Sequence, residues 1–183
     1  MSETTAEVIL IAFNGIGAGV LVFVNGVVQK IMNQMDELEF KRFMNMLDKA
    51  AMSDPIAVTV ATLPVLAALA YWIAFGFGHW WFTAGIVVWA VGSAMTKVVN
   101  MPIYQWLANP NNTDREELRI KRRKLQLGNK MRAWTTLASV VLMASQFGPV
   151  EVAATIVVSI VLSVPFMWLS RKYTPGATQP IAA

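Results

Sequence analysis

The sequence predicts an all-α membrane protein, a polytopic bundle of five transmembrane helices with amphipathic cytosolic segments. Two observations predict this class. The 183 residues are 56% hydrophobic and only 14% charged, whereas about 25% of the residues of a soluble domain are charged. The apolar residues also form long blocks, because no charged residue falls within 55–78, 80–96 or 152–170. A block of about 18 such residues is long enough to cross the hydrocarbon core of a bilayer.

A single transmembrane domain is expected over 1–172, followed by a flexible tail over 173–183 that is rich in Pro, Gly and Thr. The N-terminal segment carries acids and no Lys or Arg, so it lacks the basic start of a secretory signal. The first apolar block is therefore expected to remain in the protein as a span. The five expected spans cover about 8–32, 55–77, 80–104, 131–147 and 152–169.

The first span carries small and polar residues that predict contact with other helices. Gly15 and Gly19 form a small-xxx-small pair, which favours close helix packing. Asn14 and Asn25 are eleven residues apart, or about three helical turns. We expect both amides to point into the bundle, because an amide that faces lipid has no hydrogen-bond partner.

Two segments outside the spans are predicted to be amphipathic helices. In 34–54, apolar residues recur at helical spacing, which predicts a cytosolic or interfacial helix. Pro55 then suits a helix start, and Pro64 should kink the second span. The second amphipathic segment follows the loop at 109–112, where Thr113 and Glu116 fit a capping box.

This second segment is strongly basic, which favours contact with anionic lipid. Such a segment remains in the cytosol and lies against anionic headgroups, although specific binding of an anionic ligand or partner remains an alternative. Nucleic-acid binding is not expected, because no known reader motif accompanies the charge. The eight basic residues of this stretch are Arg115, Arg119, Lys121, Arg122, Arg123, Lys124, Lys130 and Arg132.

The distribution of Lys and Arg predicts an orientation. If Arg132, at the start of the fourth span, is counted with the loop before it, the successive segments outside the five spans carry none, three, none, eight, none and two basic residues. Basic loops remain on the cytoplasmic side. The pattern therefore predicts a multi-pass protein of the cell (inner) membrane, with its N-terminus outside and its C-terminus in the cytoplasm.

A few polar residues near the span ends are candidates for function. Lys97 is an intramembrane charge, which marks function by default, although its long side chain can also reach the headgroups. At the outer ends, His79 could form a metal site with Glu7 and Glu151, or all three could be solvated helix ends. The sequence contains no cysteine and no HExxH, P-loop or GxGxxG motif.

The third and fourth spans carry a family resemblance. Val-Asn-Met-Pro-Ile at 99–103, then Glu-Leu-Arg at 117–119 and Asn-Lys-Met-Arg at 129–132, resemble the anthrone oxygenase-like membrane proteins, long known as a domain of unknown function. The resemblance covers about 8–147. Leu125 stands where the family usually has Trp, and Asn129 stands where many members have His. Typical members look four-spanned, so the fifth span is an addition.

The resemblance implies a function and a site. Some members oxidise anthrones to anthraquinones without a metal or flavin, which implies no cofactor here. Asn100, Asn129 and Arg132 match the family pattern and, with the nearby Lys97, become the expected catalytic cluster for a lipid-soluble aromatic or quinone-like substrate. The same polar groups could instead join helices and contact headgroups. An accessory, non-catalytic subunit of a larger membrane complex is the alternative function.

Overall fold

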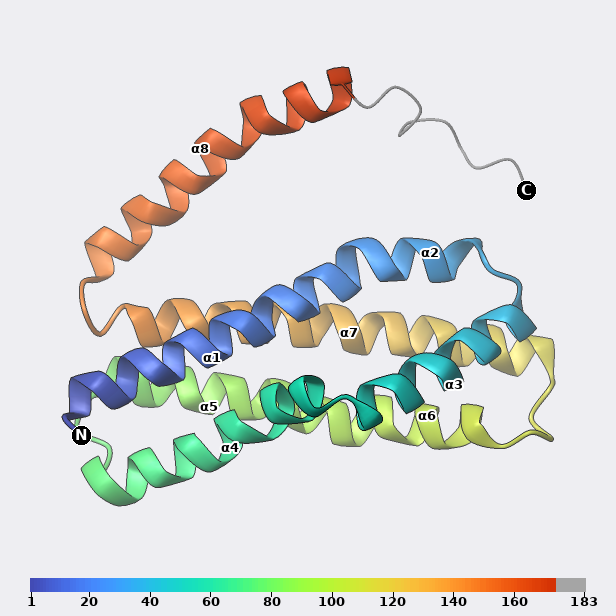
Figure 1. Cartoon of the computed structure of the whole chain (residues 1–183), viewed down its shortest axis with the longest axis horizontal. Helices are drawn as coiled ribbons and strands as arrows, with labels where there is room; N and C mark the ends of the chain where they lie inside the picture. Colours follow the sequence, from blue (N-terminus) through green and yellow to red (C-terminus); the bar gives the residue numbers. More distant parts are fainter. Residues whose placement is uncertain (174–183) are drawn as a thin grey trace. The chain divides into compact units, whose positions relative to one another are not determined.

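The structure, a computed structural model, describes residues 1–173. These residues form six continuous helices and no strand, which confirms the all-α prediction (Figure 1). The chain divides into two compact units, Met1–Gln146 and Phe147–Ala183, and each is described by itself. The tail predicted for 173–183 lies outside the described residues from 174 onward.

Three of these helices are long and apolar enough to cross a membrane. They agree with the first three predicted spans in number and place. Two of them begin at residues whose side chains cap the helix: Ser2 caps the first through the Thr5 N–H, and Asp54 caps the second through the Ala57 N–H. The three helices run over Glu3–Gln34, Pro55–Phe75 (α4) and Trp80–Ala108.

Two of the long helices contain a wider π-helical turn. The first helix consists of α1 (Glu3–Phe23), the π turn η1 (Val24–Val28) and α2 (Gln29–Gln34). The third consists of α5 (Trp80–Met95), the π turn η2 (Thr96–Asn100) and α6 (Met101–Ala108). Such turns occur often at functional sites.

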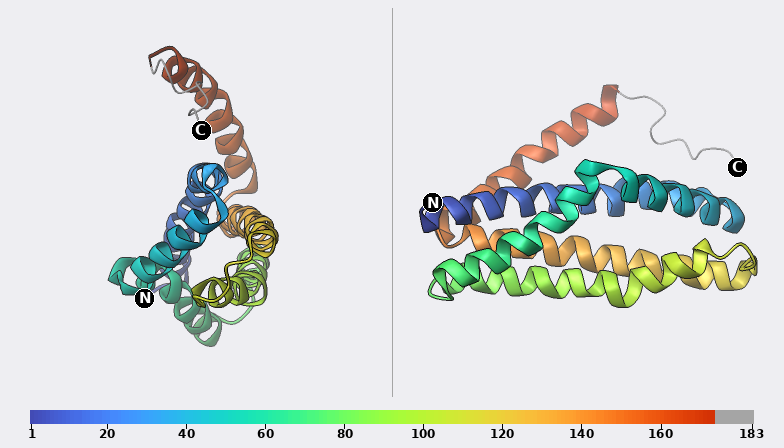
Figure 2. Two further views of the ribbon diagram at one scale, coloured as in Figure 1. Left: turned by 90° about the vertical axis from the view of Figure 1, so that its right-hand side faces the viewer. Right: turned by 60° about the horizontal axis from the view of Figure 1, so that its bottom comes forward.

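The amphipathic segment after the first helix is α3 (Glu37–Ser53). Asp36 and Glu39 form a capping box, in which Asp36 accepts the N–H of Leu38 and of Glu39 at 2.8 Å. Phe40 and Met44 are buried on the face of α3 that packs against α6 and α7. The segment is therefore part of the folded bundle at the end far from the N-terminus (Figure 2).

The longest unbroken helix is α7 (Arg115–Ala144), which joins the basic segment to the fourth predicted span. Its N-cap is Asp114, which accepts the N–H of Glu117 at 2.9 Å, so the predicted cap at Thr113 was wrong by one residue. This helix packs most extensively on α5 and next on α1. The fifth predicted span falls within α8 (Pro149–Tyr173), whose apolar part is Pro149–Pro165.

The buried apolar side chains of the first unit form two clusters, one toward each end of the bundle. The cluster near the N-terminus contains Ala6, Leu10, Ala68, Tyr71, Phe82, Ile86 and Met143. The cluster toward α3 contains Met32, Phe40, Met44, Ile103, Leu107, Leu118 and Leu125. Polar groups lie between and beyond these clusters, and they are the candidates for function.

Two expectations for the first helix are met only in part. A Cβ added at Gly15 or Gly19 would meet no atom within 4 Å among the described residues, so the pair forms no close helix contact within this part of the chain. Asn14 is buried and its side-chain amide donates to the Leu10 carbonyl at 2.9 Å, but Asn25 remains partly exposed. Asn25 belongs to the π turn η1, whose wider turn changes the helical phase that the spacing argument assumed.

Candidate functional site

The π turn η2 places Asn100 at the contact with α7. Pro102, two residues later, has no N–H to donate and its ring crowds the carbonyl four residues earlier. A wider turn relieves that crowding, so the Asn-x-Pro sequence gives a local physical reason for η2. Asn100 is the last residue of this turn, and its side chain is fully buried.

Asn100 and Asn129 form a buried carboxamide pair. The side-chain amide of Asn100 donates to Oδ1 of Asn129 at 2.9 Å, and Asn129 is only 4% exposed. Oδ1 of Asn100 is buried and accepts no hydrogen bond within the part of the chain that the structure describes. A buried acceptor left without a donor is energetically costly. This oxygen can therefore accept a hydrogen bond from a ligand or from water.

Gly128 allows α7 to approach η2 this closely. A Cβ at this position would collide with Oδ1 of Asn100 and would lie 3.2 Å from Cγ1 of Val99. Gly85 and Gly92 of α5 have the same role farther along, where an added Cβ would collide with Met143 and Thr135 of α7. The close contact between these helices thus depends on three glycines.

Of the other two predicted site residues, Arg132 lies near the Asn100–Asn129 pair, whereas Lys97 does not. Arg132 is half-buried and interacts with the Tyr104 side chain, which also interacts with Asn100. Tyr104 was not among the predicted site residues, although it lies one helical turn after Asn100. Lys97 is exposed, as expected of a side chain that extends toward headgroups.

A small apolar cavity lies one turn farther along α7 from Asn129. Its volume is about 120 Å³, and it is lined by Val22, Asn25, Ala133, Trp134 and Leu137. Trp134 is 61% exposed, and Val22 and Leu137 are also exposed. The cavity is therefore at the outer surface of the bundle, where a membrane would supply lipid.

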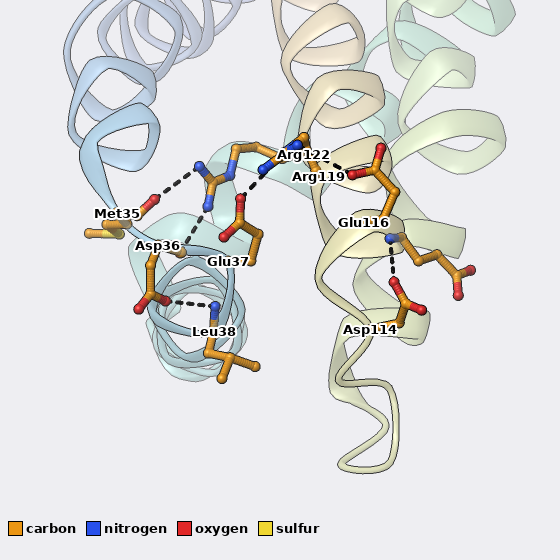
Figure 3. Close-up of polar contacts among 9 residues, drawn as sticks. Met35, Asp36, Glu37, Leu38, Asp114, Glu116, Arg119 and Arg122 are labelled. Atoms are coloured by element: carbon orange, nitrogen blue, oxygen red, sulfur yellow. Dashed lines mark hydrogen bonds and ion pairs between the residues drawn. The ribbon is translucent and has the colours of Figure 1, made fainter.

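Basic side chains join the segments at the far end of the bundle (Figure 3). The guanidinium of Arg122 donates to the carbonyls of Met35 and Asp36 at 3.0 and 2.8 Å, and it lies over the Phe40 ring at 4.7 Å. The buried Lys41 ammonium donates to the carbonyls of Asn109 and Asn112 at 2.6 and 2.8 Å.

These contacts show that Arg122, one of the basic residues predicted to face headgroups, instead binds other segments of the chain. Burial lowers the pKa of the Arg122 guanidinium, and the carboxylates of Glu37 and Asp36 oppose that shift. Arg122 thus closes the corner between α2 and α3 onto α7. Arg123, Lys124 and Lys130 of α7 are exposed.

A second polar cluster lies at the end of the bundle where the chain begins. Nδ1 of His79 is 2.6 Å from Oε1 of Glu7 and 3.4 Å from Oε1 of Glu3. The hydroxyl of Tyr71 donates to Glu3 and to Glu7, each at 3.0 Å. The hydrogen bond to Glu7 raises the pKa of His79, although burial opposes the shift.

The sequence analysis paired His79 with Glu7 and Glu151. Within the first unit, the structure confirms Glu7 as a partner of His79. Glu151 belongs to the second unit, in the first turn of α8. The carboxylate that joins His79 and Glu7 is that of Glu3, which the sequence analysis missed. The four-residue spacing of Glu3 and Glu7 was the available signal, because it places both on one helix face.

Comparison with known proteins adds no relative. No family model matches the chain, and neither a curated protein nor a solved structure is significantly similar to it.

Proposed function

We propose that this chain is a five-span membrane protein that binds a flat, lipid-soluble aromatic or quinone-like substrate beside Asn100 and oxidises it with O₂. The observation that carries the proposal is the buried carboxamide pair, because one of its oxygens has no donor while a phenol and a guanidinium lie beside it. Intramembrane polar groups that are not fully satisfied are candidates for ligand binding.

The membrane arrangement is part of this proposal. Three helices can span a bilayer, and α7 packs along two of them, which supports a fourth crossing by the part after Met131. The apolar part of α8 would supply the fifth. The basic loops then put the Asn100 end of the bundle in the cytosolic leaflet and the N-terminus outside. The exposed basic residues of α7 would contact anionic headgroups.

The chemistry follows from the substrate class. In an anthrone, the CH₂ between the aromatic rings lies across the central ring from a carbonyl. It loses a proton to water, and the charge moves to the former carbonyl oxygen to give an electron-rich oxyanion. O₂ then adds at carbon, and the resulting hydroperoxide loses water to leave a ketone. The guanidinium of Arg132 would stabilise the oxyanion, because donors in a dry site act strongly on developing charge. The unpaired Oδ1 of Asn100 would instead accept a hydrogen bond from a hydroxyl of the substrate.

The cavity beside Trp134 supplies a route from the bilayer. Its volume of about 120 Å³ is below the ~300–1,000 Å³ of typical ligand pockets. A tricyclic substrate must therefore displace the exposed Trp134 ring as it moves toward Asn129.

Oxygen uptake by the purified chain with an anthrone tests the proposal. The wild type should consume O₂ faster than the uncatalysed reaction, and Asn100→Ala and Arg132→Gln should each lower that rate at least tenfold. Arg123→Gln, which removes an exposed charge of the same helix, should leave the rate unchanged. Equal rates in all four proteins would reject the enzyme.

A non-catalytic accessory subunit is the second candidate, and the open glycines of α1 favour it. Gly15, Gly17 and Gly19 meet nothing within the described residues, so α1 offers a surface on which another helix could pack closely. Affinity purification in mild detergent separates the two functions. A stoichiometric membrane assembly, together with unchanged oxidation by Asn100→Ala, would support the subunit.

A further inference from the structure

We propose that Glu3, Glu7 and His79 bind one divalent transition-metal ion, of the Zn²⁺ or Mn²⁺ type, at the end of the bundle where α1 begins. This site is separate from the proposed oxidation site, because Asn100 follows His79 by 21 residues along the third long helix, a distance of about 30 Å at about 1.5 Å per residue. The metal inference therefore does not depend on the proposed function.

The local sequence places the three ligands together. Ser2 caps α1 through the Thr5 N–H, so the helix already includes Glu3. The four-residue spacing to Glu7 then aligns both carboxylates on one face. On the other side, α4 ends at Gly76, whose φ of 76° is strained for any residue with a side chain. The short turn that follows brings His79 to these carboxylates.

The donor atoms already lie close together. One ligand atom from each of the three residues falls within 4.8 Å of the others. Zn–N and Zn–O bonds of about 2.0–2.2 Å separate neighbouring tetrahedral ligands by about 3.4 Å. The separation of His79 Nδ1 from Glu3 Oε1 is 3.4 Å, and that from Glu7 Oε1 is 2.6 Å. Only a small opening of the His79–Glu7 contact is needed for an ion to enter.

The charge of the cluster favours a cation. Glu7 is 1% exposed, and a buried carboxylate requires a compensating charge or hydrogen bonds. Within the described residues, neither Glu3 nor Glu7 forms an ion pair with Lys or Arg, so one imidazole faces two carboxylates. A divalent ion would neutralise both.

The chemistry of the donors indicates the class of ion. One imidazole nitrogen and two carboxylate oxygens suit Zn²⁺, Mn²⁺ or Fe²⁺, whereas Mg²⁺ and Ca²⁺ prefer all-oxygen sites. Tyr71 donates to both carboxylates and would orient them, as outer groups commonly do around metal ligands. Three protein ligands leave a fourth position open for water or substrate.

Metal titration of the purified full chain tests the proposal. The protein, carrying a cleavable tag without histidine, is treated with EDTA and titrated with Zn²⁺ by calorimetry, and Mn²⁺ binding is followed by electron paramagnetic resonance. The chain has one histidine, so a single imidazole NMR signal reports directly on the site. We expect one equivalent of Zn²⁺ to bind and to shift that signal, while Mg²⁺ does not.

Variants decide whether the binding belongs to this cluster. His79→Gln and Glu3→Gln should each weaken Zn²⁺ binding at least tenfold. The side chains of both residues are about one-third exposed, so their replacement should leave the fold intact, as thermal unfolding can verify. Glu116→Gln, at an exposed carboxylate of α7, is the matched control and should bind like the wild type. No saturable binding, or equal affinity in all variants, would overturn the metal site.

Discussion

At the scale of single residues, the Asn100–Asn129 pair shows how one buried hydrogen bond can serve both packing and function. The pair joins η2 to α7 and leaves one oxygen without a donor. Its contribution to stability should be modest, because polar contacts between membrane helices average about 0.6 kcal/mol. The unpaired oxygen is the atom on which the proposed substrate binding rests.

The coupling of the two amides can be measured. Asn129→Ala removes the acceptor of the Asn100 amide and should lower the free energy of unfolding by about 1 kcal/mol. Asn100→Ala should have a similar effect, and the double variant should lose less than the sum of the two. Unfolding in mixed micelles provides the three values. Strict additivity would show that the two side chains do not interact.

Asp36 gives a pH dependence at the start of α3. Hydrogen bonds from the backbone of Glu39 and Leu38 lower its pKa from the ordinary value of 3.8. Its stabilisation is therefore present above about pH 4 and is lost as the pH falls through the lowered folded-state pKa. Asp36→Asn keeps the cap without the charge, so below pH 4 its unfolding midpoint should fall less than that of the wild type. If the unfolding midpoints of the wild type and of Asp36→Asn fell equally below pH 4, the stabilising role of the Asp36 charge would be contradicted.

At the scale of helices, the contact of α7 with the third long helix depends on small residues. Gly128→Ala would drive a methyl group into Asn100 and separate the helices. We expect a loss of about 1–3 kcal/mol, the usual cost of overpacking.

Gly15→Ala is the matched control, because this position is open. It should be neutral or stabilising by up to about 1 kcal/mol, since Ala favours helix over Gly. Thermal unfolding of both variants provides the comparison. A Gly128→Ala protein as stable as Gly15→Ala would contradict the close approach.

The corner between α2 and α3 depends on one arginine. Arg122→Gln loses two hydrogen bonds to backbone carbonyls and the contact with the Phe40 ring. The expected cost is about 1–2 kcal/mol. Arg123→Gln, an exposed neighbour, should change stability by less than about 0.5 kcal/mol. Protease sensitivity near Met35 provides a second readout, and equal cleavage of both variants would contradict the role of Arg122.

At the scale of the whole molecule, the sequence predicted those helices whose position depends on the pattern of apolar residues within one segment. Apolar blocks located the three long helices, and the periodicity of 34–54 located α3. These two features depend on the spacing of apolar residues, which a single sequence contains. The expected grouping of Asn100, Asn129 and Arg132 came instead from the family resemblance and from their place near the ends of two spans.

Contacts between segments distant in sequence could not be predicted in the same way. The choice of Gly128 rather than Gly15 as a contact depends on which helices become neighbours. Arg122 looked like one of eight equivalent cations, and only the packing of α7 against α2 separates it from the rest. Glu3 was missed because its role depends on the turn that returns His79 to the start of α1.

The central claim is that the chain crosses the membrane with its two polar clusters on opposite sides. Because the sequence contains no cysteine, a single introduced thiol can be labelled without background. In intact cells, a membrane-impermeant maleimide should label Gly78→Cys, beside the His79 cluster, but not Asn111→Cys, which follows the Asn100 helix. After permeabilisation it should label both. Labelling of both positions in intact cells, or of Asn111→Cys alone, would contradict the account.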